Sequence, residues 1–299
     1  MVRSSVFLQR TKWLSGTLAL WLLIGSAFVA QADETNKSPQ PDKIMALAPN
    51  LVEILFELGV GHKIIGVSEH TDFPEKARQI PIVANYLGVQ LERVIEKQPD
   101  LILVWHGTTP QNDINKLTSL GIKIETFYAE SVPDLVTEIT RMGQLIGTPQ
   151  RAKQLASQIQ QEYQQILSTR ELTSGTESST WPIGFIEIWP EPLTTAGSQT
   201  IVGMSIELCG LNNMYSEAGP QYPQASLEKV LTTQPDVIIQ PVSFSNPTKT
   251  KDWSSYSFLN AVKKQAIISP NADALFRWGP RLTAEISALC ADIQKVIKN

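Results

Sequence analysis

Short apolar runs alternate with helical stretches along most of the chain. The apolar runs that read as strands are residues 44–47, 64–67, 101–105, 122–127, 183–188 and 237–240. Helical patterns fill residues 51–58, 92–97 and 111–120, and each ends at a helix-stopping residue: Gly59, Pro99 or Gly121. Strands that alternate with helices predict an α/β protein whose sheets are mostly parallel.

Residues 132–172 break this alternation, because they read as helical almost throughout, with one interruption at residues 147–149. Apolar side chains recur at helical spacing in the second part, at Ala152, Leu155, Ile159, Tyr163, Ile166 and Leu167. We expect a first lobe over residues 43–145, an inter-lobe helix over 146–172 and a second lobe over 173–299. A helix resists bending more than a flexible linker does, which predicts only a small closure of the lobes on a ligand.

One phrase occurs twice in the chain. Tyr86 is followed after four residues by LERVI and then QPDLI at 98–102; Tyr222 is followed in the same way by LEKVL and QPDVI at 234–238. The copies start 136 residues apart (222 against 86), too far for the repeat of a solenoid, and an apolar strand follows each. We expect two similar lobes with mostly parallel central sheets, joined by one long backbone helix, and a ligand cleft between them.

The first 32 residues have the pattern of a signal peptide. Basic residues at Arg3, Arg10 and Lys12 precede an apolar run over 13–30, which ends in the small-x-small sequence of residues 30–32. A single membrane anchor is the alternative, since the run is nearly long enough to cross a bilayer. We expect cleavage near Ala32, an exported protein, and a polar, disordered lead-in over residues 33–42.

Charge and cysteine content narrow the classes of function. The leader holds three of the 25 basic residues and none of the 29 acidic ones, so the remaining chain has 22 against 29, a net charge of −7. That balance disfavours nucleic acid and anionic membranes as partners. In an oxidising compartment the two cysteines, Cys209 and Cys290, favour one disulfide over two free thiols, and their spacing fits neither a metal site nor a CxxC redox motif.

Recognisable catalytic motifs are missing from the sequence. It contains no phosphate-binding glycine loop, no GxSxG and no HExxH, and its histidines, His62, His70 and His106, include no pair four residues apart. The sequence therefore favours a binding protein, with no cofactor of its own, over an exported enzyme that works on a bound tetrapyrrole.

Aromatic side chains gather where strands are predicted to end. They are His70, Tyr86, Trp105, Trp189, Tyr222 and the pair Phe276 and Trp278 around Arg277. Ligands of open parallel sheets bind at the carboxyl ends of strands, so these rings indicate a flat, largely apolar ligand. The alternative is that the same rings pack in the core or on the lobe surface.

Glu92 and Glu228 occupy equivalent positions, six residues after the tyrosine of each copy. A carboxylate in the first turn of a helix is stabilised by the helix dipole, which explains either residue alone. Their occurrence once in each lobe favours a pair of exposed acids that dock onto basic residues of a two-fold partner.

Together these features resemble the substrate-binding proteins of ABC importers for cobalamin, haem and ferric siderophores. The resemblance covers residues 43–297, and its most specific segments are SEHTDFP at 68–74, GVQLER at 88–93, VWHG at 104–107, LTSLGIK at 117–123, ELCG at 207–210 and YPQASLE at 222–228. It implies two α/β lobes joined by one long helix, a periplasmic location, and a monomer that binds a corrinoid, with cobalamin as the expected ligand. The expected partner is a dimeric permease with its ATPase subunits.

Position by position, the resemblance assigns Glu92 and Glu228 to permease docking, and Cys209 and Cys290 to a disulfide. It assigns Trp105 and Tyr222 to the ligand cleft, together with the stretch Asp273, Ala274, Leu275, Phe276 and Arg277. The cobalamin-binding pattern has Trp where this chain has Tyr86, and Tyr where it has His70. Because Tyr and His ligate haem iron, haem and ferric siderophores stay open as alternative ligands.

Overall fold

The computed structural model describes residues 40–174, 180–245 and 249–298. The chain divides into two units, residues 1–40 and 41–299, and the second holds both lobes. The expected signal peptide and most of the expected lead-in therefore lie outside the described residues. Pro41 and Asp42, at the end of that lead-in, are held in place: the Lys63 ammonium donates to the Pro41 carbonyl at 3.1 Å and pairs with Asp42 at 2.8 Å.

The first lobe is built on a sheet in the order β4-β3-β2-β1-β5-β6. Its strands are β1 (Ile44–Ala46), β2 (Ile64–Ser68), β3 (Ile82–Asn85), β4 (Gly88–Val89), β5 (Leu101–Trp105) and β6 (Ile124–Phe127). Every pairing is parallel except that of β3 with β4. Helices α1 (Pro49–Glu57), α2 (Leu91–Lys97) and α3 (Gln111–Ser119) connect the strands, with 3₁₀ turns at Gly61–Lys63 and Glu75–Gln79.

The second lobe has a smaller parallel sheet in the order β10-β7-β11-β12. Its strands are β7 (Ile183–Ile186), β10 (Asn212–Asn213), β11 (Val237–Ile239) and β12 (Ile267–Ile268), and β8 (Trp189–Pro190) and β9 (Leu193–Thr194) form a separate antiparallel pair. The helices are α6 (Ile201–Leu208), α7 (Leu227–Thr233), α8 (Asn260–Lys263), α9 (Ala272–Leu275) and α10 (Leu282–Ile297).

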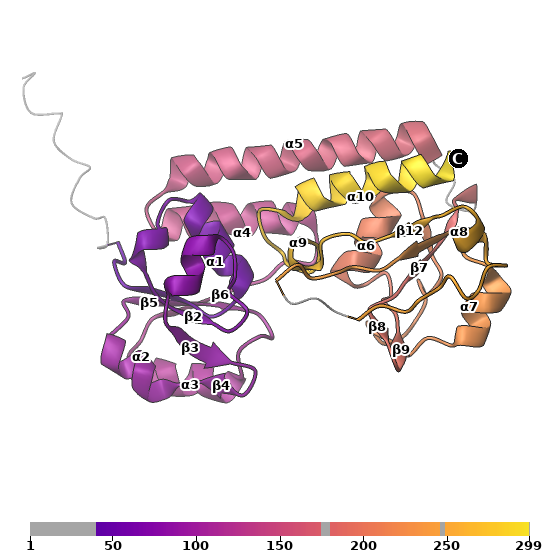
Figure 1. Cartoon of the computed structure of the whole chain (residues 1–299). Helices are drawn as coiled ribbons and strands as arrows, with labels where there is room; N and C mark the ends of the chain where they lie inside the picture. The colour runs from indigo at the N-terminus through magenta and orange to yellow at the C-terminus, as the bar shows by residue number, and fades with distance from the viewer. Residues whose placement is uncertain (1–39, 175–179, 246–248, 299) are drawn as a thin grey trace, which may run out of the picture. The chain divides into compact units, whose positions relative to one another are not determined.

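Two consecutive helices, α4 (Val132–Leu145) and α5 (Pro149–Ser174), form the backbone between the sheets. Figure 1 shows α5 running above both lobes, with α10 alongside its second half. The long helix begins later than the 146–172 we expected, because Gly147 takes a left-handed conformation (φ +80°) that ends α4, and Pro149 starts α5. The α/β fold of two lobes joined by a long helix is thus as the sequence predicts.

The repeated phrase has the same structure in both lobes. α2 ends at Gln98 and α7 ends at Gln234, and both glutamines take left-handed backbone angles (φ +48° and +55°). A proline follows each, so neither helix continues, and the chain turns into β5 or β11.

The aspartate of each copy then joins two neighbouring strands. The Asp100 carboxylate accepts the backbone N–H groups of Asp42 and Lys43, just before β1, at 3.0 and 2.9 Å. These backbone hydrogen bonds lower the pKa of Asp100. In the second lobe, the Asp236 carboxylate accepts the backbone N–H of Ile183, the first residue of β7, at 3.1 Å. Part of the repeat therefore serves the fold, and the functional roles expected of Tyr86, Tyr222, Glu92 and Glu228 stay predictions.

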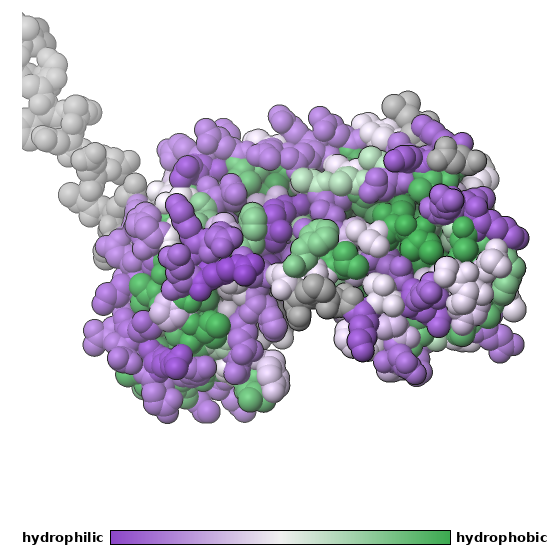
Figure 2. Space-filling view, viewed as in Figure 1, coloured by the Kyte–Doolittle hydropathy of each residue, from purple (hydrophilic) through white to green (hydrophobic). Residues whose placement is uncertain are grey.

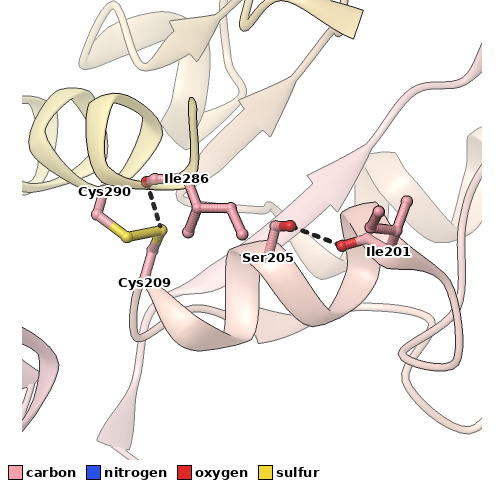
Figure 3. Close-up of a disulfide and its surroundings, with 5 residues drawn as sticks. All are labelled: Ile201, Ser205, Cys209, Ile286 and Cys290. Carbon is pink, nitrogen blue, oxygen red and sulfur yellow. Dashed lines mark hydrogen bonds between the residues drawn. A yellow bond between two sulfur atoms is a disulfide. The ribbon is translucent and has the colours of Figure 1, made fainter. Parts of the chain in front are cut away.

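The predicted disulfide is confirmed. Cys209, directly after α6, is bonded to Cys290 in α10, and Figure 3 shows the two helices meeting at this bond. Buried apolar residues of α6 and α10 belong to the same core as those of α1, α4 and α5. The disulfide thus fixes the second lobe to the helix that lies along the inter-lobe backbone.

Candidate functional site

Two of the predicted ring-bearing residues, His70 and Tyr86, line one pocket at the carboxyl ends of the first-lobe strands. The pocket has a volume of about 190 Å³, and its walls come from the segments that follow β1, β2, β3 and β5. His70 takes a left-handed backbone conformation (φ +62°) in the turn after β2 and is exposed. Tyr86 is 86% exposed in the turn between β3 and β4. Both rings are therefore free to meet a ligand.

On the second lobe, Trp189 and Tyr222 lie on neighbouring segments. Trp189 in β8 pairs with Thr194 in β9, and Thr194 forms an antiparallel bridge with Gln224. The next backbone group, the N–H of Thr195, donates to the Pro223 carbonyl at 3.0 Å. Both rings are about half exposed, and partial burial raises the pKa of the Tyr222 hydroxyl. The second lobe thus offers two half-exposed rings on neighbouring segments.

Figure 2 shows the surface hollowed between the two lobes. The first-lobe pocket opens at strand ends, where ligands of parallel sheets bind. Exposed rings on both lobes agree with the arrangement that the sequence predicts for binding a flat ligand. That these rings and the hollow between the lobes bind a ligand stays a prediction.

Trp105 lies differently from the other rings. It is only 9% exposed, and it shares a sheet face with Leu101 and Leu103, whose side chains pack in the main core. Successive strand residues point to opposite faces, so the odd-numbered positions of β5 all face the core that contains residues of α1, α4 and α5. In this conformation Trp105 therefore exposes little of its side chain to a ligand.

The predicted stretch 273–277 is also mostly occupied by the protein itself. Ala274 and Leu275 are buried in the lobe, and the Asp273 carboxylate accepts hydrogen bonds from the segment 243–245. Phe276 is the one large apolar side chain of the stretch that is exposed, at 39%. Arg277 contacts the first lobe rather than open space.

An ion cluster joins the two lobes around Glu53, whose side chain is 1% exposed in α1. Arg277 donates to the Glu53 carboxylate at 3.1 Å and to the Asp72 carboxylate at 3.0 Å. Arg281 donates to both oxygens of Glu53, at 2.7 and 2.9 Å. Both acids belong to the first lobe and both bases to the second. No pattern in the sequence predicted this group of four charged residues, which we call the inter-lobe cluster.

The inter-lobe cluster also holds the loop that carries His70. Arg277 donates to the His70 carbonyl at 3.2 Å, and the Arg281 guanidinium lies 4.0 Å above the Phe73 ring. Burial alone would raise the pKa of Asp72, but hydrogen bonds from Ser245 and Arg277, with the positive charge of Arg277, lower it below its usual value. Burial would likewise lower the pKa of Arg281, and the Glu53 carboxylate raises it instead. Both shifts favour the charged form, so the Asp72 carboxylate and the Arg281 guanidinium carry their charges at neutral pH.

Glu92 and Glu228 are both exposed in the first turns of α2 and α7. Neither carboxylate has an ion-pair partner within the part of the chain that the structure describes. Exposed and unpaired acids at equivalent sites on both lobes suit the docking role that the sequence predicts, and that role stays a prediction.

In the described ranges, 40–174, 180–245 and 249–298, no three His, Cys, Asp or Glu side chains gather as possible metal ligands. The exposed His106 ring instead meets the Tyr128 ring edge-on, with centroids 5.1 Å apart. Among the described helices, none combines the length and the apolar character needed to cross a membrane.

Residues 44–269 match the model of a family described as periplasmic binding protein. The chain belongs to this family. Its relatives by sequence similarity include the vitamin B12-binding protein of Pectobacterium carotovorum. That protein is 30% identical over 253 residues, which span 85% of this chain and 88% of the relative. The vitamin B12-binding protein of Yersinia pseudotuberculosis is 28% identical over 257 residues, 85% of this chain and 87% of the relative.

Solved structures of the family share the fold. The periplasmic vitamin B12-binding protein BtuF of Vibrio cholerae superposes with a TM-score of 0.75 at 26% identity, over 87% of this chain and 99% of that protein. The periplasmic haem-binding protein BhuT has a TM-score of 0.73 at 17% identity, over 87% and 100%, and this likeness concerns the fold alone. The fold is thus shared by solved proteins whose names give different ligands, vitamin B12 and haem.

Proposed function

We propose that this chain is the substrate-binding protein of an ABC importer and that it captures cobalamin between its two lobes. The observation that carries the proposal is the set of exposed rings on both lobes: His70 and Tyr86 on the first, Trp189 and Tyr222 on the second. Relatives and a solved structure with 26% identity bear the name of vitamin B12-binding proteins, which supports the same ligand.

Ring-bearing side chains suit a corrinoid because its macrocycle is broad, nearly flat and largely apolar. Each aromatic residue that a ligand covers removes apolar area from water, at about 25 cal/mol per Å². The rings already lie on structured segments, so little conformational freedom is lost when they are covered. On this proposal, cobalamin is the cargo, and the protein releases it chemically unchanged. The protein itself would hold no resident cofactor.

Delivery of the ligand requires a transporter, and the exposed acids at equivalent positions of the two lobes are the groups through which the protein would bind it. We propose that Glu92 and Glu228 pair with basic residues on the two halves of a dimeric permease, whose ATPase subunits supply the energy. The binding protein would act as a monomer in the periplasm, after removal of a signal peptide near Ala32. Permease and ligand would thus contact different residues of the chain.

Calorimetric titration with cyanocobalamin tests the ligand. We expect saturable one-to-one binding that weakens when Trp189 or Tyr222 is changed to alanine, while the melting temperature is unaffected. Absence of binding at high micromolar protein concentration would refute cobalamin as the ligand. Mass spectrometry of the released ligand, compared with the ligand supplied, separates a carrier from an enzyme that alters it.

Haem is a second candidate because His70 and Tyr86 line one pocket. These two residue types are among the axial ligands of haem iron. Titration with haemin would then shift the Soret band, and changing His70 or Tyr86 to alanine would abolish the shift. If haemin leaves the band unshifted while cyanocobalamin binds, this second candidate is excluded.

A further inference from the structure

Phe244 is an exposed ring at the lobe boundary that the sequence analysis did not single out. Its side chain is 72% exposed, in the segment that follows β11. Isolated exposed apolar residues are common on protein surfaces, so exposure alone assigns no role. What distinguishes Phe244 is how firmly the backbone on either side of it is held.

One carboxylate, that of Asp273, holds the whole segment 243–245. It accepts the backbone N–H groups of Phe244 and Ser245, at 3.1 and 3.2 Å. It also accepts the hydroxyls of Ser243 and Ser245, at 2.8 and 3.1 Å. The backbone N–H of Asp273 in turn donates to the Asn271 side chain at 2.9 Å. Since these groups all point towards Asp273, the exposed ring of Phe244 lies on the outer side of the segment.

The same segment reaches the first lobe. The Ser245 hydroxyl lies within hydrogen-bonding reach of both the Asp273 and the Asp72 carboxylates and shares its single proton between them. Its contact with Asp72 is one of the interactions that lower the pKa of Asp72, against the raising effect of burial. Asp72 lies two residues after His70, which lines the first-lobe pocket. Arg277 holds both the Asp72 carboxylate and the His70 carbonyl. Phe244 is therefore adjacent in sequence to the residue that joins its segment to the His70 loop.

We propose that Phe244 is a further ligand-binding side chain of the second lobe, held in advance to stack on the flat ligand between the lobes. The inference rests on the proposed function. An aromatic ring that is exposed in the free protein, on a backbone fixed by hydrogen bonds, binds a flat ligand without first having to be ordered. Phe276, also exposed, lies three residues after Asp273.

The test compares Phe244→Ala with Phe244→Trp and with a matched control, Phe258→Ala, by calorimetric titration with cyanocobalamin and with haemin. Phe258 is also exposed, at 48%, and it packs against Tyr256 before α8, which Figure 1 places at the far end of the second lobe. We expect Phe244→Ala to lower the association constant about tenfold to hundredfold, as loss of a covered ring predicts. Phe244→Trp keeps a ring and should stay within about threefold of the wild type, and Phe258→Ala within about twofold.

Each outcome decides the inference. A loss of affinity for Phe244→Ala with rescue by Phe244→Trp supports it, because a damaged fold would not be rescued by a larger ring. If the wild-type protein binds a probe and Phe244→Ala binds it equally well, the inference is refuted and the proposed function stands. Unchanged affinity together with weaker binding to the permease would assign the ring to the transporter and also refute it. If the wild-type protein binds neither probe, the proposed function fails and the inference falls with it.

Discussion

Replacing Glu53 by glutamine removes one charge from the inter-lobe cluster while keeping the shape of the side chain. The Glu53 side chain is 1% exposed and faces Arg277 at 3.1 Å and Arg281 at 2.7 Å. After the change, Arg277 still has Asp72 at 3.0 Å. Arg281 loses its carboxylate partner. The variant therefore leaves one guanidinium charge without a counter-charge.

The expected loss of stability follows from this geometry. Removing one partner of a buried pair costs about 3–5 kcal/mol, because the other charge stays buried. The arginine side chains are 16% and 23% exposed, so water compensates part of that loss, and about 3 kcal/mol is our expectation. For a protein of this size, such a loss lowers the melting temperature by about 6–12 °C.

Thermal melting followed by circular dichroism, at pH 7 and low salt, measures the effect. The matched control is Glu57→Gln, one turn later on the same helix, where the side chain is exposed. We expect the control to change the free energy of unfolding by less than about 0.5 kcal/mol. Changing Arg281 to glutamine in the Glu53→Gln background should restore part of the stability, because it removes the uncompensated charge. If Glu53→Gln melts no lower than Glu57→Gln, the charges of the cluster do not stabilise the contact between the lobes.

Three other changes test separate parts of the structure. Because the folded-state pKa of Asp72 is lowered, its contribution to the free energy of unfolding is complete above about pH 4 and is lost as the pH falls through the folded pKa. Asp72→Asn should therefore flatten the acid side of the curve of stability against pH, measured by urea unfolding. The disulfide closes a sequence separation of 81 residues, so changing Cys209 and Cys290 to alanine should cost about 4 kcal/mol in the same urea assay; no loss would contradict the loop-entropy argument. Changing Glu92 and Glu228 to arginine should abolish binding to the permease in reconstituted vesicles and leave cyanocobalamin affinity near wild type; a loss of ligand affinity would instead place the acids in the cleft or the fold.

The elements marked by apolar runs or by helix-stopping residues were predictable from the sequence. Strands β1, β2, β5 and β6 and helices α1, α2 and α3 lie within three residues of the predicted bounds. Their positions follow from apolar periodicity and from stop signals such as Gly121, which are local properties. The pairs β3 with β4 and β8 with β9 were missed, since β4, β8 and β9 are two-residue strands, too short to show a period.

The candidate site was only partly predictable, because a side chain's use depends on what lies opposite it. The sequence placed Trp105 at a strand end, and only the packed sheet shows that it shares the core face of Leu101 and Leu103. The family resemblance assigned Arg277 to the ligand, and that assignment stays a prediction; the structure adds the contact between Arg277 and Glu53, 224 residues away in the chain. No local pattern connects residues at that separation.

By itself, the sequence determined the two-lobed α/β architecture, the inter-lobe helix and the equivalence of Tyr86 with Tyr222 and of Glu92 with Glu228. These features are written in short segments, where periodicity, helix stops and repeated residues act over a few neighbours. The tertiary structure alone decided which rings stay exposed, that the lobes are joined by four charges, and that Asp273 holds the segment around Phe244. Burial and charge pairing arise only when distant segments meet, since desolvation and ion pairing depend on the surroundings of a side chain and not on its place in the chain.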